Sequence, residues 1–89
     1  MSTTLNVKFA TYGALAEGSP TGTQAAIVTD ALQAAIDAHS GIVQIDNTTM
    51  NGDPAFGSTK HFGAVVIRNG IERAFACQEG QTINFNAGN

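Results

Sequence analysis

Apolar and polar side chains alternate along residues 4–12, which is the pattern of a strand with one buried face. Leu5, Val7 and Phe9 are separated by the polar Asn6 and Lys8. We therefore expect a strand over residues 4–12. The following segment, 13–22, is rich in Gly and also contains Ser and Pro, so it predicts a mobile connection without regular structure.

A helix is expected after this connection, ending near His39. Thr21 with Gln24 three residues later matches a capping box, and Thr23 is a competing N-cap. The apolar positions of the segment fall on one helical stripe, with polar positions opposite: Val28, Leu32, Ala35 and Ile36 against Asp30, Gln33 and Asp37. Gly41 supplies the left-handed residue that commonly ends a helix.

Asn69-Gly70 is the strongest turn signal in the chain. Both central residues of a type I′ turn need positive φ, and Asn-Gly meets that need at low cost. The flanking runs 60–68 and 71–78 therefore predict a β-hairpin. A two-residue turn fixes its register and places these pairs on one side of the sheet: Arg68 with Ile71, Val66 with Arg73, Ala64 with Phe75, and Phe62 with Cys77.

The other side of this hairpin is also apolar, since it carries Val65, Ile67, Ala74 and Ala76. One helix can pack on only one face of a sheet. We expect the second face to be covered, either by a subunit contact or by the loop 47–59. The alternative is that these residues are simply exposed, as scattered apolar residues often are in soluble proteins.

Short strands are expected at 42–46 and at 82–86, the latter after a turn at 79–81. The whole pattern predicts an α+β fold, with one amphipathic helix packed on a mainly antiparallel sheet of about five strands in the order β-α-β-β-β-β. Eighty-nine residues suit one domain, 1–89.

Charged residues make up 12% of the chain and the net charge is −3, with four Lys and Arg in total. The usual charged share is about 25%, so the surface is unusually neutral and repels copies of itself weakly. With no basic stripe and no apolar run of membrane-spanning length, neither nucleic acid nor a membrane span is expected. The N-terminus lacks a signal-peptide pattern, which predicts a cytoplasmic protein or one exported by another route.

The sequence gives little indication of a catalytic or metal-binding site, and no cofactor is expected. Cys77 would need a base, but the predicted register places His61 on the other face of the sheet. The oxygen-bearing side chains of 46–53 miss the spacing of an EF-hand loop, which leaves an irregular calcium site or local Asx turns.

The loop 47–59 is the natural place for a binding site, because loops on a rigid scaffold often carry function. Asn51, Asp53 and Lys60 bring polar groups near the aromatic Phe56, an arrangement that a carbohydrate site would use. The alternative is that the same residues have a purely structural role, with a turn at Asp53-Pro54 and an ion pair between Asp53 and Lys60.

The chain also resembles a small domain of unknown function at the C-terminus of a mitochondrial DnaJ-homologue family, which has relatives in other bacterial and fungal proteins. The matching residues span nearly the whole sequence: Val7, Ala10, Tyr12 and Gly13; Val28-Thr29 and Leu32; Gly52-Asp53-Pro54, Gly57 and Lys60; Gly70, Glu79-Gly80 and Ile83. The resemblance implies an interaction domain without an assigned chemistry. We therefore expect a non-enzymatic interaction or self-assembly module that forms a homo-oligomer, with a lectin-like binder as the alternative.

Overall fold

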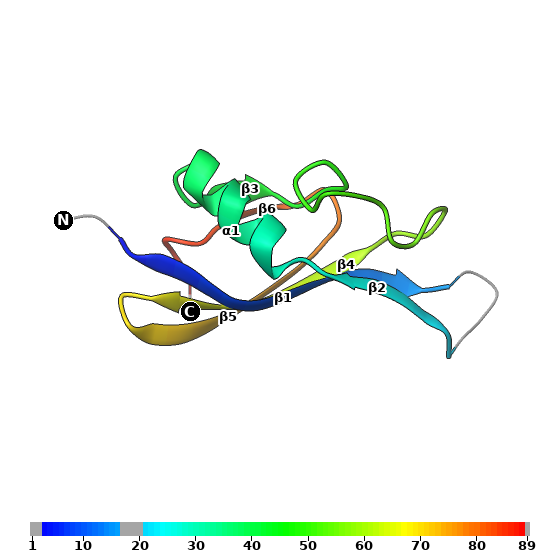
Figure 1. Ribbon diagram of the computed structural model, residues 1–89, viewed down its shortest axis with the longest axis horizontal. Coiled ribbons are helices and arrows are strands. Elements are labelled where there is room, and N and C mark those ends of the chain that lie inside the picture. The colour runs from blue at the N-terminus through cyan, green and yellow to red at the C-terminus, as the bar shows by residue number, and fades with distance from the viewer. Residues whose placement is uncertain (1–2, 17–20, 89) are drawn as a thin grey trace.

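The chain forms one helix and two antiparallel sheets in the computed structural model, which describes residues 3–16 and 21–88 (Figure 1). The elements are β1 (Leu5–Leu15), β2 (Thr23–Ile27), α1 (Thr29–Ala38), β3 (Ile42–Gln44), β4 (His61–Arg68), β5 (Ile71–Gln78) and β6 (Thr82–Asn84). The larger sheet has the order β2-β1-β4-β5, and β3 pairs with β6 in a separate small sheet.

The α+β class is confirmed, but two details of the predicted architecture are wrong. An additional strand, β2, precedes the helix, so the order is β-β-α-β-β-β-β. The short strands β3 and β6 do not join the main sheet. They pair with each other and lie, with α1 and the long loop, on one side of it (Figure 1).

Residues 23–27 form a strand and not the first turns of the helix. Gly13 to Leu15 continue β1 beyond its predicted end, and β2 pairs with them antiparallel, from Thr11 opposite Ile27 to Leu15 opposite Thr23. This pairing satisfies backbone groups along the whole segment and outweighs the helix propensity of its alanines. The predicted connection shrinks accordingly, and its residues 17–20 lie outside the described part of the chain.

The helix begins at Thr29, where β2 ends. Val28 occupies the N-cap position without a side-chain cap, so neither Thr21 nor Thr23 acts as the cap. The Val28 amide instead donates to the Ala10 carbonyl (2.9 Å), and the Thr29 hydroxyl accepts from the Ala10 amide (3.2 Å). These bonds to β1 fix the point at which the strand turns into the helix.

The predicted apolar stripe of α1 is confirmed, because Val28, Leu32, Ala35 and Ile36 are all buried. Gln33, expected on the solvent side, is half-buried. Its side chain accepts from the Val7 amide (2.8 Å) and donates to the Leu5 carbonyl (3.1 Å). The helix is thus bound to β1 beside the bulge between Val7 and Phe9.

The Asn-Gly hairpin is confirmed in turn and in register. Asn69 and Gly70 have φ values of 52° and 85°, and Arg68 faces Ile71 while Phe62 faces Cys77. Because side chains alternate across a strand, Phe62, Ala64, Val66 and Phe75 point toward α1 and are buried.

The C-terminal segment closes the core. Phe85 is fully buried, with its ring centroid 4.7 Å from that of Phe75 and 6.4 Å from that of Phe62. The Arg68 guanidinium donates to the carbonyls of Phe85, Ala87 and Gly88 at 2.7–3.2 Å. The hairpin therefore holds the last residues against the sheet.

Candidate functional site: the outer face of the sheet

The side of the main sheet that faces away from α1, here called the outer face, is a mainly apolar surface. It carries Phe9, Thr11, Gly13 and Leu15 of β1, Thr23, Ala25 and Ile27 of β2, His61, Gly63, Val65 and Ile67 of β4, and Ala74 and Ala76 of β5. These residues share a face because strand residues two apart point the same way and paired residues lie side by side.

Apolar side chains are well exposed across the outer face. Ile27 is 75% exposed, Leu15 52% and Phe9 47%. Val65 and Ile67 are half-buried by their neighbours, and Ala74 and Ala76 are exposed. The structure thus brings together the four residues singled out from the sequence and adds Leu15 and Ile27, which sequence reasoning missed. It also corrects the placement of Phe9, which the alternation put on the buried face with Leu5 and Val7, because the bulge after Val7 turns it to the outer face.

The register aligns these residues in rows across the strands. Phe9 lies beside Val65, which lies beside Ala74. Ile27, Thr11, Gly63 and Ala76 form the next row. Along the first row every side chain is apolar, and contiguous apolar patches of this kind mark interaction surfaces more often than isolated exposed residues do.

Charge is nearly absent from the outer face. The charged side chains at its end are Lys8 and Glu72, which form an exposed ion pair with 3.0 Å between Nζ and Oε2 and so neutralise each other. A second neutral surface can therefore approach without leaving an unpaired charge buried.

The long loop does not cover the outer face, contrary to one of the two coverings expected from the sequence. Residues 45–60 run on the α1 side of the sheet (Figure 1). The helix and the small sheet lie on that side too. Within residues 3–16 and 21–88, no element packs on the outer face.

The loop 47–59 is instead fastened to the sheet by Lys60, which is 3% exposed. Its ammonium lies 2.9 Å from Asp53 Oδ1 and 3.6 Å from Glu79 Oε1, and donates to the carbonyls of Ala55 and Ser58. The ion pair with Asp53 expected from the sequence is present. Lys60 is therefore a buried structural anchor and does not offer its charge to a ligand.

Asp53 and Lys60 stabilise each other's charged forms. The hydrogen bond from Lys60 lowers the pKa of Asp53, and the bond to Asp53 raises the pKa of Lys60 against the opposing effect of burial. Tyr12, fully buried nearby, donates to Asn47 Oδ1 at 2.7 Å. Burial and the negative charges of Glu79, Asp46 and Asp53 hold the pKa of Tyr12 far above its usual range.

We expect the Asp53–Lys60 pair to shape the acid unfolding of the protein. Because the pKa of Asp53 is lower in the folded state than its ordinary value of 3.8, its contribution to stability is present above about pH 4 and is lost as the pH falls through the folded pKa. Asp53→Asn should therefore lower the Tm at pH 6 and have little effect at pH 2.

Thermal unfolding followed by circular dichroism between pH 2 and pH 7 checks this expectation. Asp37→Asn, at an exposed carboxylate of α1, is the matched control and should change the Tm little at either pH. An Asp53→Asn deficit of equal size at pH 2 and pH 6 would show that the ion pair does not carry the effect.

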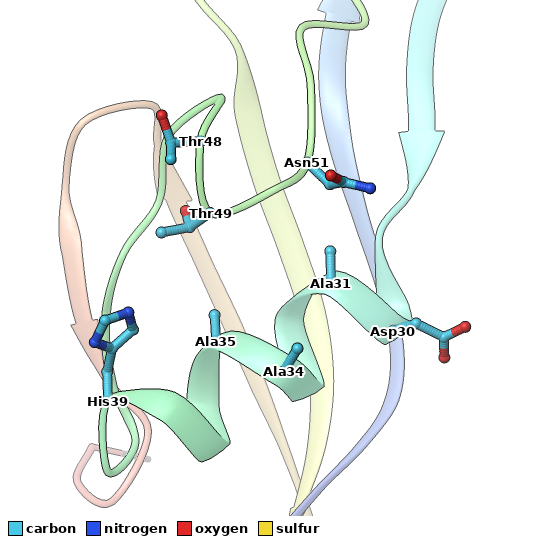
Figure 2. A pocket seen from close by; sticks show the side chains of 8 residues that line it. All are labelled: Asp30, Ala31, Ala34, Ala35, His39, Thr48, Thr49 and Asn51. Carbon is cyan, nitrogen blue, oxygen red and sulfur yellow. The ribbon is translucent and has the colours of Figure 1, made fainter.

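The other two residues of the proposed loop site are Phe56 and Asn51. Phe56 is 90% exposed. Asn51 lines a hollow of about 530 Å³ between α1 and the loop, together with Ala31, Ala34, Thr48 and Thr49 (Figure 2). Phe56, Asp53 and Lys60 are not among the residues that line it. Of the four residues proposed for the loop site, Asn51 alone lines this hollow.

Figure 2 shows the methyl groups of Ala31 and Ala35 pointing from the helix toward the loop segment that carries Thr49. The Thr49 hydroxyl is already bonded to the Gln44 carbonyl (2.7 Å), and the Thr49 amide to the Asp46 carboxylate (2.9 Å). These are the local Asx-type contacts that the sequence offered as the alternative to calcium binding. In the described part of the chain, no three His, Cys, Asp or Glu side chains are grouped so as to hold a metal ion.

Cys77 and His61 are separated as the predicted register requires. Cys77 faces Phe62 and packs against the core, whereas His61 is exposed on the outer face. Burial raises the pKa of the Cys77 thiol, which reduces the thiolate fraction that nucleophilic chemistry needs.

No family model, curated protein or solved structure matches the chain. The resemblance to the DnaJ-homologue C-terminal domain therefore stays a prediction. Among the described residues, no helix has the length and apolar character to cross a bilayer.

Proposed function

We propose that the protein is a non-enzymatic self-assembly module that associates with copies of itself through the outer face. The observation that carries this proposal is the exposure of Ile27, Leu15 and Phe9 on one neutral sheet face that no described element covers. Burying apolar area contributes roughly 25 cal/mol per Å², so an opposing surface of the same kind gains free energy over water.

A copy of the same chain suits this face better than a charged partner does. Among the described residues of the outer face, the charged side chains Lys8 and Glu72 form an ion pair and neutralise each other, so the face presents no net charge to a partner. The low overall charge of −3 over 89 residues also limits the repulsion between copies.

Multi-angle light scattering on wild-type protein over a concentration series tests the proposal. We expect a mass above the 9.2 kDa of one chain, rising with concentration. Ile27→Lys places a charge at the most exposed apolar position of the face and should return the mass to that of one chain without loss of fold. Val65→Lys tests the centre of the face in the same way.

Phe56→Lys is the matched control, because it changes an even more exposed apolar side chain outside the outer face. Its mass should follow that of the wild type. A wild-type protein that remains one chain at millimolar concentration would contradict the proposal.

Carbohydrate binding by the loop is the second candidate, and the 90% exposure of Phe56 is the observation that favours it. We rank it below self-assembly because Asp53 and Lys60 are committed to each other. A glycan array probed with wild type and with Phe56→Ala tests this function. Only glycan signals that the wild type gives and the variant loses would support it.

A further inference from the structure

The strand β2 is an edge of the main sheet, and the hydrogen bonds at its two ends show which of its backbone groups are used. At one end the Ala16 amide donates to the Gly22 carbonyl (2.7 Å), and at the other the Val28 amide donates to the Ala10 carbonyl (2.9 Å). Bonds in an antiparallel ladder fall on every second residue of each strand. The even-numbered residues of β2 therefore bond to β1, and the odd-numbered ones point their backbone groups away from it.

The odd-numbered residues of β2 leave a row of free backbone donors and acceptors. They are Thr23, Ala25 and Ile27, which are all exposed, and within residues 3–16 and 21–88 no group is bonded to their amides or carbonyls. Figure 1 shows the strand running away from the start of α1, so the helix does not cover this edge. A row of this kind is a template on which a further strand can pair.

The β2 edge also lacks the features that protect exposed edges from pairing, which are charges, prolines and bulges. Residues 21–28 contain no charged residue and no proline, and the register of β2 with β1 is unbroken. The other edge strand, β5, is better protected. It carries the charged Glu72, and the amide and carbonyl of Gln78 are both bonded to Gln81 (2.8 and 3.2 Å). The edge suited to pairing is therefore β2.

A second copy of β2 matches this edge in the register centred on Ala25. A two-fold axis perpendicular to the sheet at this residue pairs Ala25 with its counterpart, and Thr23 of each copy with Ile27 of the other. Each of these pairs exchanges two backbone bonds, so every free group of the row finds a partner. Thr23 and Ile27 are both β-branched, and such side chains pack well against their neighbours on a pleated surface.

This axis keeps the outer faces of the two copies on the same side of one continuous sheet. The neutral apolar surface is thereby extended from one chain to the next. A five-residue edge, about 17 Å long and about 10 Å thick, covers far less than the roughly 800 Å² per partner of a standard interface. Edge pairing therefore supplements the outer-face contact and does not replace it.

We infer that β2 pairs with β2 of a second copy in an antiparallel, two-fold arrangement centred on Ala25, which extends the sheet across two chains. The inference rests on the proposed self-assembly through the outer face and adds a second contact surface. One outer face covers one other, so face contact alone stops at two chains. With paired edges as well, each chain has two neighbours and the assembly reaches four chains or more.

Ala25→Pro tests the edge pairing without adding a charge to the outer face. Proline has no N–H and is tolerated on an edge strand where the N–H faces solvent, so the fold should persist. In sedimentation velocity at millimolar concentration, its assembly should have roughly half the wild-type mass or less, because only the face contact remains. Ala25→Ser keeps the amide and is the matched control, which should assemble as the wild type does.

An NMR measurement on the wild type determines the register without any variant. In the inferred pairing, Gln24 of one copy faces Ala26 of the other as a non-hydrogen-bonded pair, with about 4.5 Å between the Cα atoms. A sample that mixes ¹³C-labelled and unlabelled chains should therefore show a nuclear Overhauser contact between the Hα atoms of these two residues. Contacts of β2 with β5 of another copy, or no contact of β2 with another copy in an assembled wild type, would overturn the inference.

The outcomes separate this inference from the proposed function. A wild type that stops at two chains overturns the edge pairing and leaves self-assembly through the outer face standing. An Ala25→Pro variant that assembles as fully as the wild type does the same. A wild type that never associates overturns both.

Discussion

Phe85→Ala is expected to destabilise the fold by about 4 kcal/mol, because it removes a fully buried ring from the centre of the core. The ring contacts Phe62 of β4 and Phe75 of β5 from a segment that follows β6. Its loss leaves a cavity and also releases the C-terminal segment from the hairpin. Urea unfolding followed by circular dichroism measures the change.

Phe56→Ala is the matched control for this prediction, since it deletes the same side chain at a position that is 90% exposed. Substitutions at such surface positions usually change stability by less than about 0.5 kcal/mol. Equal effects of the two substitutions would mean that the C-terminal segment does not close the core.

Gly13→Ala is expected to cost about 3 kcal/mol, the upper part of the range for overpacking a filled site. A Cβ at Gly13 would overlap the Gln24 carbonyl oxygen and the Ala25 Cα. Both are backbone atoms of β2 and cannot move aside unless the strand shifts. The substitution should therefore loosen the pairing of β1 with β2.

Gly63→Ala is the control here, because its Cβ meets no atom within 4 Å. It should leave stability unchanged or raise it slightly, since Gly within a strand is entropically unfavourable. Urea midpoints and amide hydrogen exchange of β2 distinguish the two sites. Normal protection of β2 in Gly13→Ala would contradict the close approach described here.

The hairpin was predictable because one local signal determines it. Asn69-Gly70 specifies the turn, and the period of two then fixes which side chains face α1. The apolar stripe of α1 was predictable for the same reason, since its period of 3.6 continues without interruption from Val28 to Ile36.

The strand β2 was not predictable from its own residues, because Gln24, Ala25 and Ala26 favour a helix locally. Its pairing partner, residues 11–15 of β1, runs through Gly13, a residue type that commonly marks the end of a strand. One signal was present: residues 10–16 and 22–28 flank a Gly-Ser-Pro segment, as the two arms of a hairpin do. Because β2 was not predicted, the sequence did not indicate that Ile27 and Leu15 lie on the outer face. It identified only the part of that face formed by β4 and β5.

The burial of Lys60 was also beyond the sequence pattern. The sequence places Lys60 in a loop with Asp53, but the burial of its side chain depends on the carbonyls of Ala55 and Ser58 and on Glu79, which directly follows β5. No sequence motif with a fixed spacing indicates this combination of backbone and side-chain contacts.

The most direct test of the central claim is a dilution series of ¹H–¹⁵N NMR spectra. The account predicts that the amide signals that move on dilution belong to the outer-face strands, with the largest shifts near Phe9, Thr11, Gly63 and Val65. Signals of α1 and of the loop 47–59 should stay in place. Shifts confined to α1 and that loop, or spectra that do not change with concentration, would contradict it.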